Sequence, residues 1–268
     1  MLRNRLLTAI VLIPVVVGCI YLGRLAFLAL VMLLLTLAEI EFCQLAVRQG
    51  FRPAPVFGVG LVWLFLLGAY LQMRGLLGAG LALILMTSLT WQLAHREGSP
   101  VADWALTVSG GLYLGVCGAC LIELRNLHDG LWWTLTAIPA IMLADSGAYF
   151  VGSKWGRHKL APALSPGKTW EGYLAGIAFG ALLTALLASL WRLGAGTHAA
   201  INATHGLILG TLISIIAPLG DLAVSMIKRS AGVKDSGNLL PGHGGALDRV
   251  DSILWAAVIG YYYVLLLT

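Results

Sequence analysis

Residues 25–47 read LAFLALVMLLLTLAEIEFCQLAV, and this stretch decides the fold class of the chain. Its 23 mostly apolar residues exceed the about 20 that an α-helix needs to cross the hydrocarbon core of a bilayer. Runs of similar length and character recur along almost all of the 268 residues. The sequence therefore predicts an all-α, polytopic integral membrane protein and leaves no room for a soluble domain.

The composition supports the same class. Hydrophobic residues make up 59% of the chain and charged residues only 11%, and the mean hydropathy is +0.88. Soluble domains have about 25% charged residues, so an ordinary soluble domain is excluded. We predict nine transmembrane helices, at residues 6–22, 25–47, 55–71, 76–94, 101–122, 131–151, 170–190, 205–224 and 253–267.

The loops between these helices predict how the chain is oriented. With nine spans, 13 of the 17 Lys and Arg residues fall on the side of the N-terminus and four fall on the other side. Positive residues are enriched in cytoplasmic loops, so the N-terminus is predicted to be cytoplasmic. The first span follows Arg3 and Arg5 as a signal peptide would, but its apolar run is long and no cleavage site follows, which predicts a retained anchor.

Charge is concentrated in residues 225–251, which hold seven of the chain's Lys, Arg, Asp and Glu residues. Charges beside hydrocarbon cost roughly 2.5 to 3.5 kcal/mol each at a helix centre, so such a cluster usually marks a functional site. Lysine and arginine residues alone are enough to set the membrane topology, and acidic residues contribute little to it. The acids in this cluster therefore need another explanation. The mixture predicts cations held by carboxylates next to anions held by lysines.

Three carboxylates are candidate metal ligands. Asp248 and Asp251 are three residues apart and share a face if a helix begins there, and Asp221 follows a Pro–Gly break at the end of the eighth predicted helix. No cysteine or pair of histidines is near them in sequence, which favours Mg²⁺ or Mn²⁺ over Zn²⁺. The alternative for Asp248 and Asp251 is a first helical turn whose acids complement the helix dipole.

Two segments are candidate anion sites. Gly244 and Gly245 precede a predicted helix, where glycine lets backbone amides approach phosphate oxygens. The segment around Lys168 enters the seventh predicted helix from the same side. It is no P-loop, because position 162 is proline where that motif needs glycine. In the sixth predicted helix, Asp145 should face the interior, either in the site or paired with a residue such as Arg157.

Within residues 225–251 the fixed positions resemble the signature of the phosphatidate cytidylyltransferases, also called CDP-diacylglycerol synthases. The matching residues are Ser225, Ile227, Lys228, Arg229, Lys234, Asp235, Gly237, Leu240, Pro241, His243, Gly244, Gly245, Asp248, Arg249, Val250 and Asp251. The segments 144–149 and 165–172 are also similar to that family. Ala246 departs from it, because a larger aliphatic residue is usual there, and the N-terminal half matches only in being hydrophobic.

This resemblance implies Mg²⁺-dependent transfer of CMP from CTP to phosphatidic acid, with one or two metal ions. Residues 1–130 would be a scaffold and residues 131–268 would carry the catalytic motifs. The residues expected to act in catalysis are Asp221, Lys228, His243, Asp248 and Asp251, of which the three aspartates would hold the metal. Those expected to bind substrate are Asp145, Ser165, Lys168, Thr169, Ser225, Arg229, Lys234, Asp235, Gly244, Gly245 and Arg249.

Two other classes were weighed. Glu39 and Glu41 lie inside a predicted span and would suit a transporter or channel, but the two halves show no convincing repeat. A CDP-alcohol transferase needs the pattern DxxDGxxAR, and Ser252 follows Asp251. The Cys117–Cys120 pair lies in an apolar helix and predicts no redox or metal role.

The location and partners follow from the same reading. We expect a bacterial inner membrane protein whose active site faces the cytoplasm, with CTP, phosphatidic acid and membrane lipids as partners and no nucleic acid. Small residues at Gly172, Gly176 and Gly180 predict close helix packing, within the chain or in a homodimer.

Overall fold

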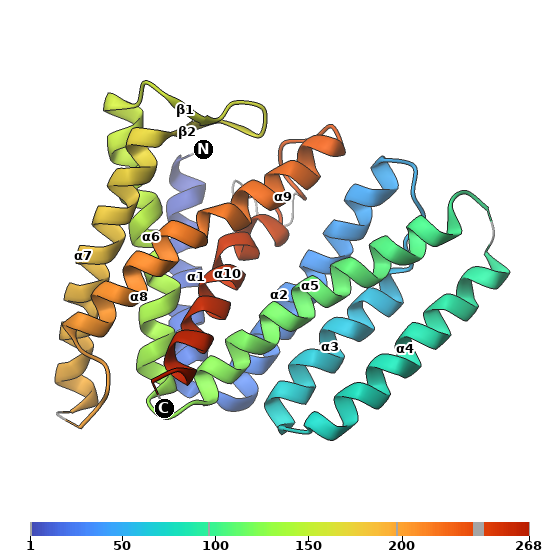
Figure 1. Cartoon of the computed structure of the whole chain (residues 1–268), viewed down its shortest axis with the longest axis horizontal. Helices are drawn as coiled ribbons and strands as arrows, with labels where there is room; N and C mark the ends of the chain where they lie inside the picture. Colours follow the sequence, from blue (N-terminus) through green and yellow to red (C-terminus); the bar gives the residue numbers. More distant parts are fainter. Residues whose placement is uncertain (1, 96, 197, 238–243, 268) are drawn as a thin grey trace. The chain divides into compact units, whose positions relative to one another are not determined.

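A computed structural model describes residues 2–95, 97–196, 198–237 and 244–267, with side chains from residue 12 onward except at positions 74 and 76. Helices dominate these residues, and two short strands interrupt them (Figure 1). The elements in chain order are α1 (Leu2–Leu22), α2 (Arg24–Arg48), α3 (Pro55–Leu71), α4 (Arg74–Ala94), α5 (Pro100–Asn126), α6 (Gly130–Trp155), β1 (Lys159–Ala161), β2 (Ser165–Thr169), α7 (Trp170–Ala195), α8 (Ala203–Ile216), α9 (Pro218–Ser230) and α10 (Leu247–Leu265). The predicted all-α membrane class is confirmed.

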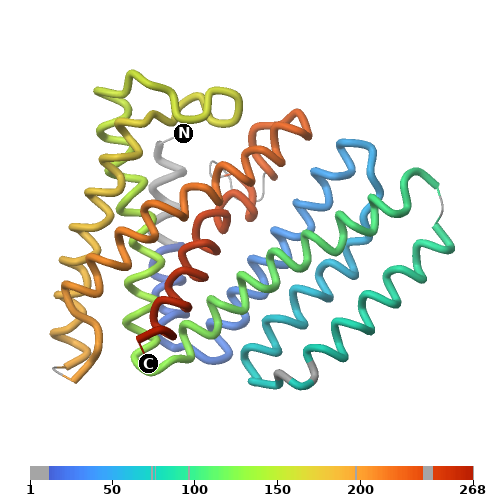
Figure 2. Tube along the Cα trace, in the orientation of Figure 1, coloured from blue at the N-terminus to red at the C-terminus, as the bar shows by residue number. Residues whose placement is uncertain are grey.

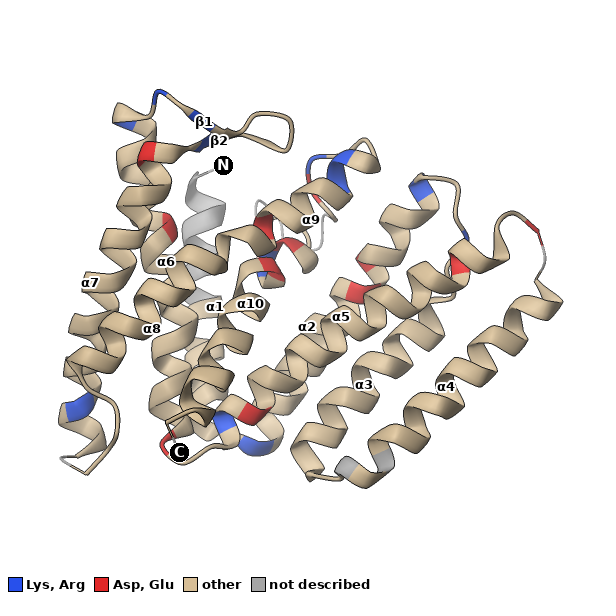
Figure 3. Ribbon diagram, viewed as in Figure 1, with Lys and Arg blue, Asp and Glu red and all other residues tan. Residues whose placement is uncertain are grey.

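Several helices have the length and composition of membrane spans. In the described part of the chain six qualify: Arg24–Arg48, Leu77–Ala94, Pro100–Asn126, Gly130–Trp155, Trp170–Ala195 and Ala203–Ser230. Figure 3 shows charged residues mainly in connecting segments and toward helix ends, while α3 and α8 carry none. The chain is thus an integral membrane protein, and the number nine and the side of the N-terminus stay predictions.

The chain divides into two compact units. The first comprises residues 1–123 and 227–250 and contains α1 to α4 with most of α5. Glycines of α5 allow close packing there: a Cβ on Gly111 would lie 2.6 Å from the carbonyl oxygen of Gly58 in α3. Leu61 and Leu114 are fully buried beside this contact, so α3 and α5 form part of the unit's apolar core.

The second unit comprises residues 124–226 and 251–268 and is built on α6, α7 and α8. Figure 2 shows α6 and α7 running side by side. A Cβ on Gly176 would lie 3.0 Å from the carbonyl oxygen of Ala144, and one on Gly180 would overlap the Ser214 hydroxyl. The predicted small-residue stripe is therefore used inside the chain, where it lets three helices meet.

A β-hairpin joins α6 to α7, which the sequence analysis did not predict. Its strands pair antiparallel, with Lys159 opposite Thr169 and Ala161 opposite Ser165. Thr169 then caps α7, because its hydroxyl oxygen accepts a hydrogen bond from the Gly172 N–H at 3.2 Å. The hairpin places Lys168 immediately before a well-capped helix.

The eighth predicted span is two helices. Pro218 has no N–H to continue α8, which ends at Ile216, and α9 begins at Pro218. Asp221 therefore lies in the first turn of α9 and does not end a helix as expected. The last helix, α10, begins at Leu247, six residues before the start predicted at position 253.

Candidate functional site

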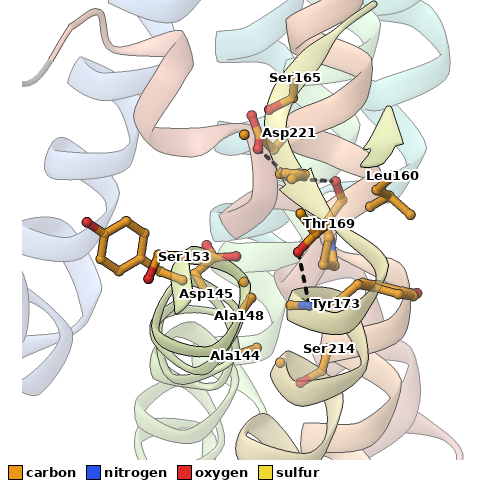
Figure 4. A pocket seen from close by; sticks show the side chains of 17 residues that line it. Ala144, Asp145, Ala148, Ser153, Leu160, Ser165, Thr169, Tyr173, Ser214 and Asp221 are labelled. Carbon is orange, nitrogen blue, oxygen red and sulfur yellow. Dashed lines mark hydrogen bonds and ion pairs between the residues drawn. The ribbon is translucent and has the colours of Figure 1, made fainter. Parts of the chain in front are cut away.

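A cavity of about 410 Å³ lies in the second unit. Its walls come from α6, the hairpin, the start of α7, the end of α8 and the start of α9. Figure 4 shows Asp145, Thr169, Tyr173 and Asp221 around it. Five of the residues predicted to act in the site line this cavity: Asp145, Ser165, Lys168, Thr169 and Asp221.

An ion pair joins two of these residues. The Lys168 ammonium lies 2.6 Å from Asp221 Oδ2 and 3.5 Å from the carbonyl oxygen of Pro218. The other oxygen, Asp221 Oδ1, accepts a hydrogen bond of 3.3 Å from the Ser225 hydroxyl. The two paired side chains are 25% and 32% exposed, so the pair is only partly buried.

Asp145 and Tyr173 line the same cavity from α6 and α7. The Tyr173 hydroxyl donates a 2.7 Å hydrogen bond to the carbonyl oxygen of Ile215, next to the break between α8 and α9. Arg157, the alternative partner considered for Asp145, lies just after α6, and its backbone N–H donates to Glu171 in the first turn of α7. Asp145 lines the same cavity as Lys168 and Asp221.

A second cluster lies in the first unit, and we name it the Asp248 cluster: Glu41, Lys228, Ser236, Gly245 and Asp248. The Lys228 ammonium lies 2.5 Å from Asp248 Oδ1, and the two side chains are 10% and 9% exposed. Asp248 Oδ2 accepts from the backbone N–H of Ser236 at 2.8 Å and of Gly245 at 3.1 Å. Burial alone would raise the pKa of Asp248, but the bonds from Lys228, Ser236 and Gly245 outweigh it and hold this pKa below its ordinary value.

The backbone amides at the start of α10 were expected to approach phosphate. Gly244 has a left-handed backbone with φ of +76°, in keeping with its place in a turn. The Gly245 N–H, however, donates to Asp248, and the N–H groups of Ala246 and Leu247 donate to Glu41, each at 2.9 Å. Carboxylates of the chain itself therefore engage these three donors.

The remaining predicted residues lie in other surroundings. Arg229, Lys234, Asp235 and Arg249 are exposed, and none of them lines the cavity. Asp251 is buried, and its Oδ1 accepts from the Ser252 N–H at 2.6 Å. His243 lies outside the described residues.

The three candidate metal ligands are divided between the two units, with Asp248 in the first and Asp221 and Asp251 in the second. Among the residues that the structure describes, no group of three or more His, Cys, Asp and Glu side chains is placed to hold a metal ion. Two of the ligands do approach each other along the backbone, since a Cβ on Gly220, next to Asp221, would lie 2.6 Å from the Asp251 carbonyl oxygen. The donors are hard oxygens, which suit Mg²⁺, and Mg²⁺ commonly binds one or two carboxylates together with waters and substrate phosphates.

Sequence reasoning missed Ser236 and Tyr173 and assigned no role to Glu41. Ser236 and Tyr173 carry no local signal, because a serine in a loop and a tyrosine in a helix are common. Glu41 did carry one, as an acid in an apolar run. Its partners lie 195 to 206 residues further along the chain, which no local pattern reveals.

Together the fold and these clusters define an integral membrane protein with lysine–aspartate pairs at two positions. Comparison with known proteins gives the family. The profile of the cytidylyltransferase family matches residues 3–267, and this chain belongs to that family.

Individual relatives agree with this assignment. The chain is 33% identical to the phosphatidate cytidylyltransferase of Bacillus subtilis (strain 168), covering 99% of this chain and 97% of that protein. It is 35% identical to the protein of that name from Haemophilus influenzae, over the whole of both chains. The Pseudomonas aeruginosa protein of the same name is 36% identical over 96% of this chain and 98% of its own length.

Proposed function

We propose that this chain transfers CMP from CTP to phosphatidic acid and so forms CDP-diacylglycerol and pyrophosphate for phospholipid biosynthesis. One observation carries the proposal: the match to the cytidylyltransferase family covers residues 3–267, and full-length relatives are named phosphatidate cytidylyltransferases. Membership of an enzyme family also decides against the transporter that Glu39 and Glu41 had suggested.

The reaction needs little acid–base chemistry from the protein. An oxygen of the lipid phosphate attacks the α-phosphorus of CTP, the bond from that phosphorus to the bridging oxygen breaks, and pyrophosphate leaves with the electron pair. A phosphate monoester has a second pKa of about 6 and is already an anionic nucleophile at neutral pH. The main task of the site is therefore to position two polyanions and to offset their charge.

The cavity of the second unit is the proposed place for phosphate groups. Lys168 enters it from the hairpin, and Ser165 and Thr169 add hydroxyl groups nearby. In the ion pair the ammonium of Lys168 is held by Asp221, which is partly exposed and able to release it to an incoming phosphate. Lys228, Arg229, Lys234 and Arg249 are proposed as further phosphate contacts, and His243 as a hydrogen-bonding residue.

Mg²⁺, as one or two ions, is proposed as the cofactor, held by Asp221, Asp248 and Asp251. When bound it would neutralise phosphate oxygens and the leaving pyrophosphate. The carboxylates fit this role chemically, because they offer hard oxygen donors. Asp221 and Asp248 each contact a lysine ammonium group, so both carboxylates already lie next to a cation.

The proposed location is the bacterial inner membrane, with the active site open to the cytoplasm. Support comes from the excess of Lys and Arg in the loops on the N-terminal side and from the cytoplasmic origin of CTP. We also propose a homodimer, which native mass spectrometry of the detergent-solubilised protein would test.

The test of the activity is direct. Purified protein in detergent is given CTP labelled at the α-phosphate, phosphatidate and Mg²⁺, and the lipid phase is searched for a CMP-bearing lipid. We expect a labelled lipid and stoichiometric pyrophosphate, both lost without phosphatidate and both lost on adding a chelator. No labelled lipid, or ion flux through proteoliposomes without turnover, would contradict the proposal.

A further inference from the structure

Glu41 makes contacts that the proposed reaction does not use. It lies in α2, in the half of the chain that carries none of the family's motif residues, and it is 6% exposed. Its Oε1 accepts from the Ala246 N–H at 2.9 Å, and its Oε2 accepts from the Leu247 N–H at 2.9 Å and the Ser236 hydroxyl at 2.8 Å. One buried carboxylate thus binds the segments on both sides of residues 238–243.

The same segments hold Asp248. Ser236 donates its N–H to Asp248 Oδ2, and its hydroxyl lies 3.0 Å from that oxygen and 2.8 Å from Glu41 Oε2. A hydroxyl has a single proton, so Ser236 bridges the two carboxylates, donating to one of them at a time. Glu41 and Asp248 are therefore linked through one side chain.

The backbone is shaped to admit the Glu41 carboxylate. A Cβ at Gly237 or at Gly245 would overlap the Glu41 side chain, and a Cβ at Gly245 would also overlap the Ser236 hydroxyl. Close approach of backbone to a side chain is a reason for glycine at both positions. Both glycines therefore face the same side chain of α2.

Electrostatics favour the same arrangement. The first N–H groups of a helix have no partner within the helix, and the N-terminus carries a partial positive charge. At α10 the Ala246 and Leu247 N–H groups point at Glu41, so this carboxylate serves as the helix cap. An amide in its place would keep one acceptor oxygen but would turn its NH₂ group toward donors at the other position.

From these contacts we propose that Glu41 is a positioning residue for the cytidylyl transfer. It fixes Ser236 and the start of α10, and these in turn hold Asp248 in contact with Lys228. The inference rests on the proposed function, in which Asp248 belongs to the reacting site.

The experiment compares Glu41→Gln with a matched control, Glu39→Gln. Glu39 lies two residues earlier on α2 and is fully buried, but it contacts Cys43 and the helices α3 and α5 rather than the Asp248 cluster. We expect Glu41→Gln to lower kcat per folded molecule about 100-fold while the KM for CTP changes less than threefold. Glu39→Gln should stay within about threefold of the parent in both constants. Equal losses in the two variants, or an unchanged kcat in Glu41→Gln, would overturn the proposal.

Two further measurements keep the test decisive. Ser236→Ala removes only the bridge between the carboxylates, so it should fold and lower kcat about tenfold even where Glu41→Gln does not fold, and an unchanged kcat would contradict the proposal. Hydrogen exchange of the Ala246 and Leu247 amides needs no activity, and should be at least tenfold faster in Glu41→Gln, or in Glu41→Asp if the first variant does not fold. Unchanged exchange refutes the role of Glu41, whereas absence of a CMP-bearing lipid with the parent protein refutes the proposed function alone.

Discussion

Two lysine–aspartate pairs in the described part of this protein have the same chemistry in different surroundings. Lys228 and Asp248 are each about nine-tenths buried, and Asp248 accepts further bonds from Ser236 and Gly245. Lys168 and Asp221 are a quarter to a third exposed and border a cavity of about 410 Å³. The first pair is fixed by the backbone, and the second is open to a ligand.

This difference in burial suits the two pairs to different tasks. A buried pair costs desolvation and is sensitive to the loss of either partner, but it holds its geometry without a ligand. A partly exposed pair contributes little to stability and is easily separated. We therefore expect the buried pair to hold the residues around it in place, and the exposed pair to exchange its mutual contact for contacts with substrate.

The largest effect is expected from Asp248→Asn. It leaves the Lys228 ammonium buried without its anion, and breaking a buried pair costs about 3 to 5 kcal/mol. Turnover should fall by at least about 10³-fold, at the upper end for loss of a preorganised electrostatic contact. Thermal unfolding in detergent and the labelled-lipid assay measure the two effects. The control is Glu97→Gln, which breaks an exposed pair with Arg52 and should change neither quantity appreciably.

Asp221→Asn should separate activity from stability. We expect turnover to fall about 10²-fold, because the carboxylate is lost from the cavity, while unfolding changes by no more than about 1 kcal/mol for a partly exposed pair. The same two assays apply. A stability loss as large as that of Asp248→Asn would abolish the distinction between the two pairs.

Lys168→Met sharpens the assignment of the open pair to substrate. A charged hydrogen bond contributes about 1.5 to 3 kcal/mol, so losing one phosphate contact should raise the KM for CTP by about tenfold or more. Lys168→Arg retains the charge and should recover most of the affinity. Equal KM values for the parent and Lys168→Met would show that Lys168 does not bind the nucleotide.

The smallest effect is expected from Thr169→Ala, which removes the cap of α7. Loss of such a cap costs about 1 kcal/mol of stability. Thermal unfolding should register it, with Thr211→Ala as the control because that exposed hydroxyl bonds only within α8. A change in Thr169→Ala no larger than in the control would mean that the hairpin, and not the cap, fixes the start of the helix.

Local features were predictable from the sequence, and distant contacts were not. Apolar runs gave the membrane class, the start of α7 at Trp170 was predicted correctly, and Pro218 marked a break because it lacks an N–H. Lys168 and Asp221 were each named, but their pairing across 53 positions of sequence was not. The contacts of Glu41 with Ser236, Ala246 and Leu247 depend on tertiary packing, which leaves no periodic trace in sequence.

The glycine contacts among α6, α7 and α8 limit the routes by which a lipid can reach the cavity. Where Gly176 lies on the Ala144 backbone and Gly180 on Ser214, the helices touch so closely that no acyl chain can pass between them. The packed helices therefore close one side of the cavity to lipid chains. If phosphatidate binds in this cavity, its two acyl chains must reach it from another side.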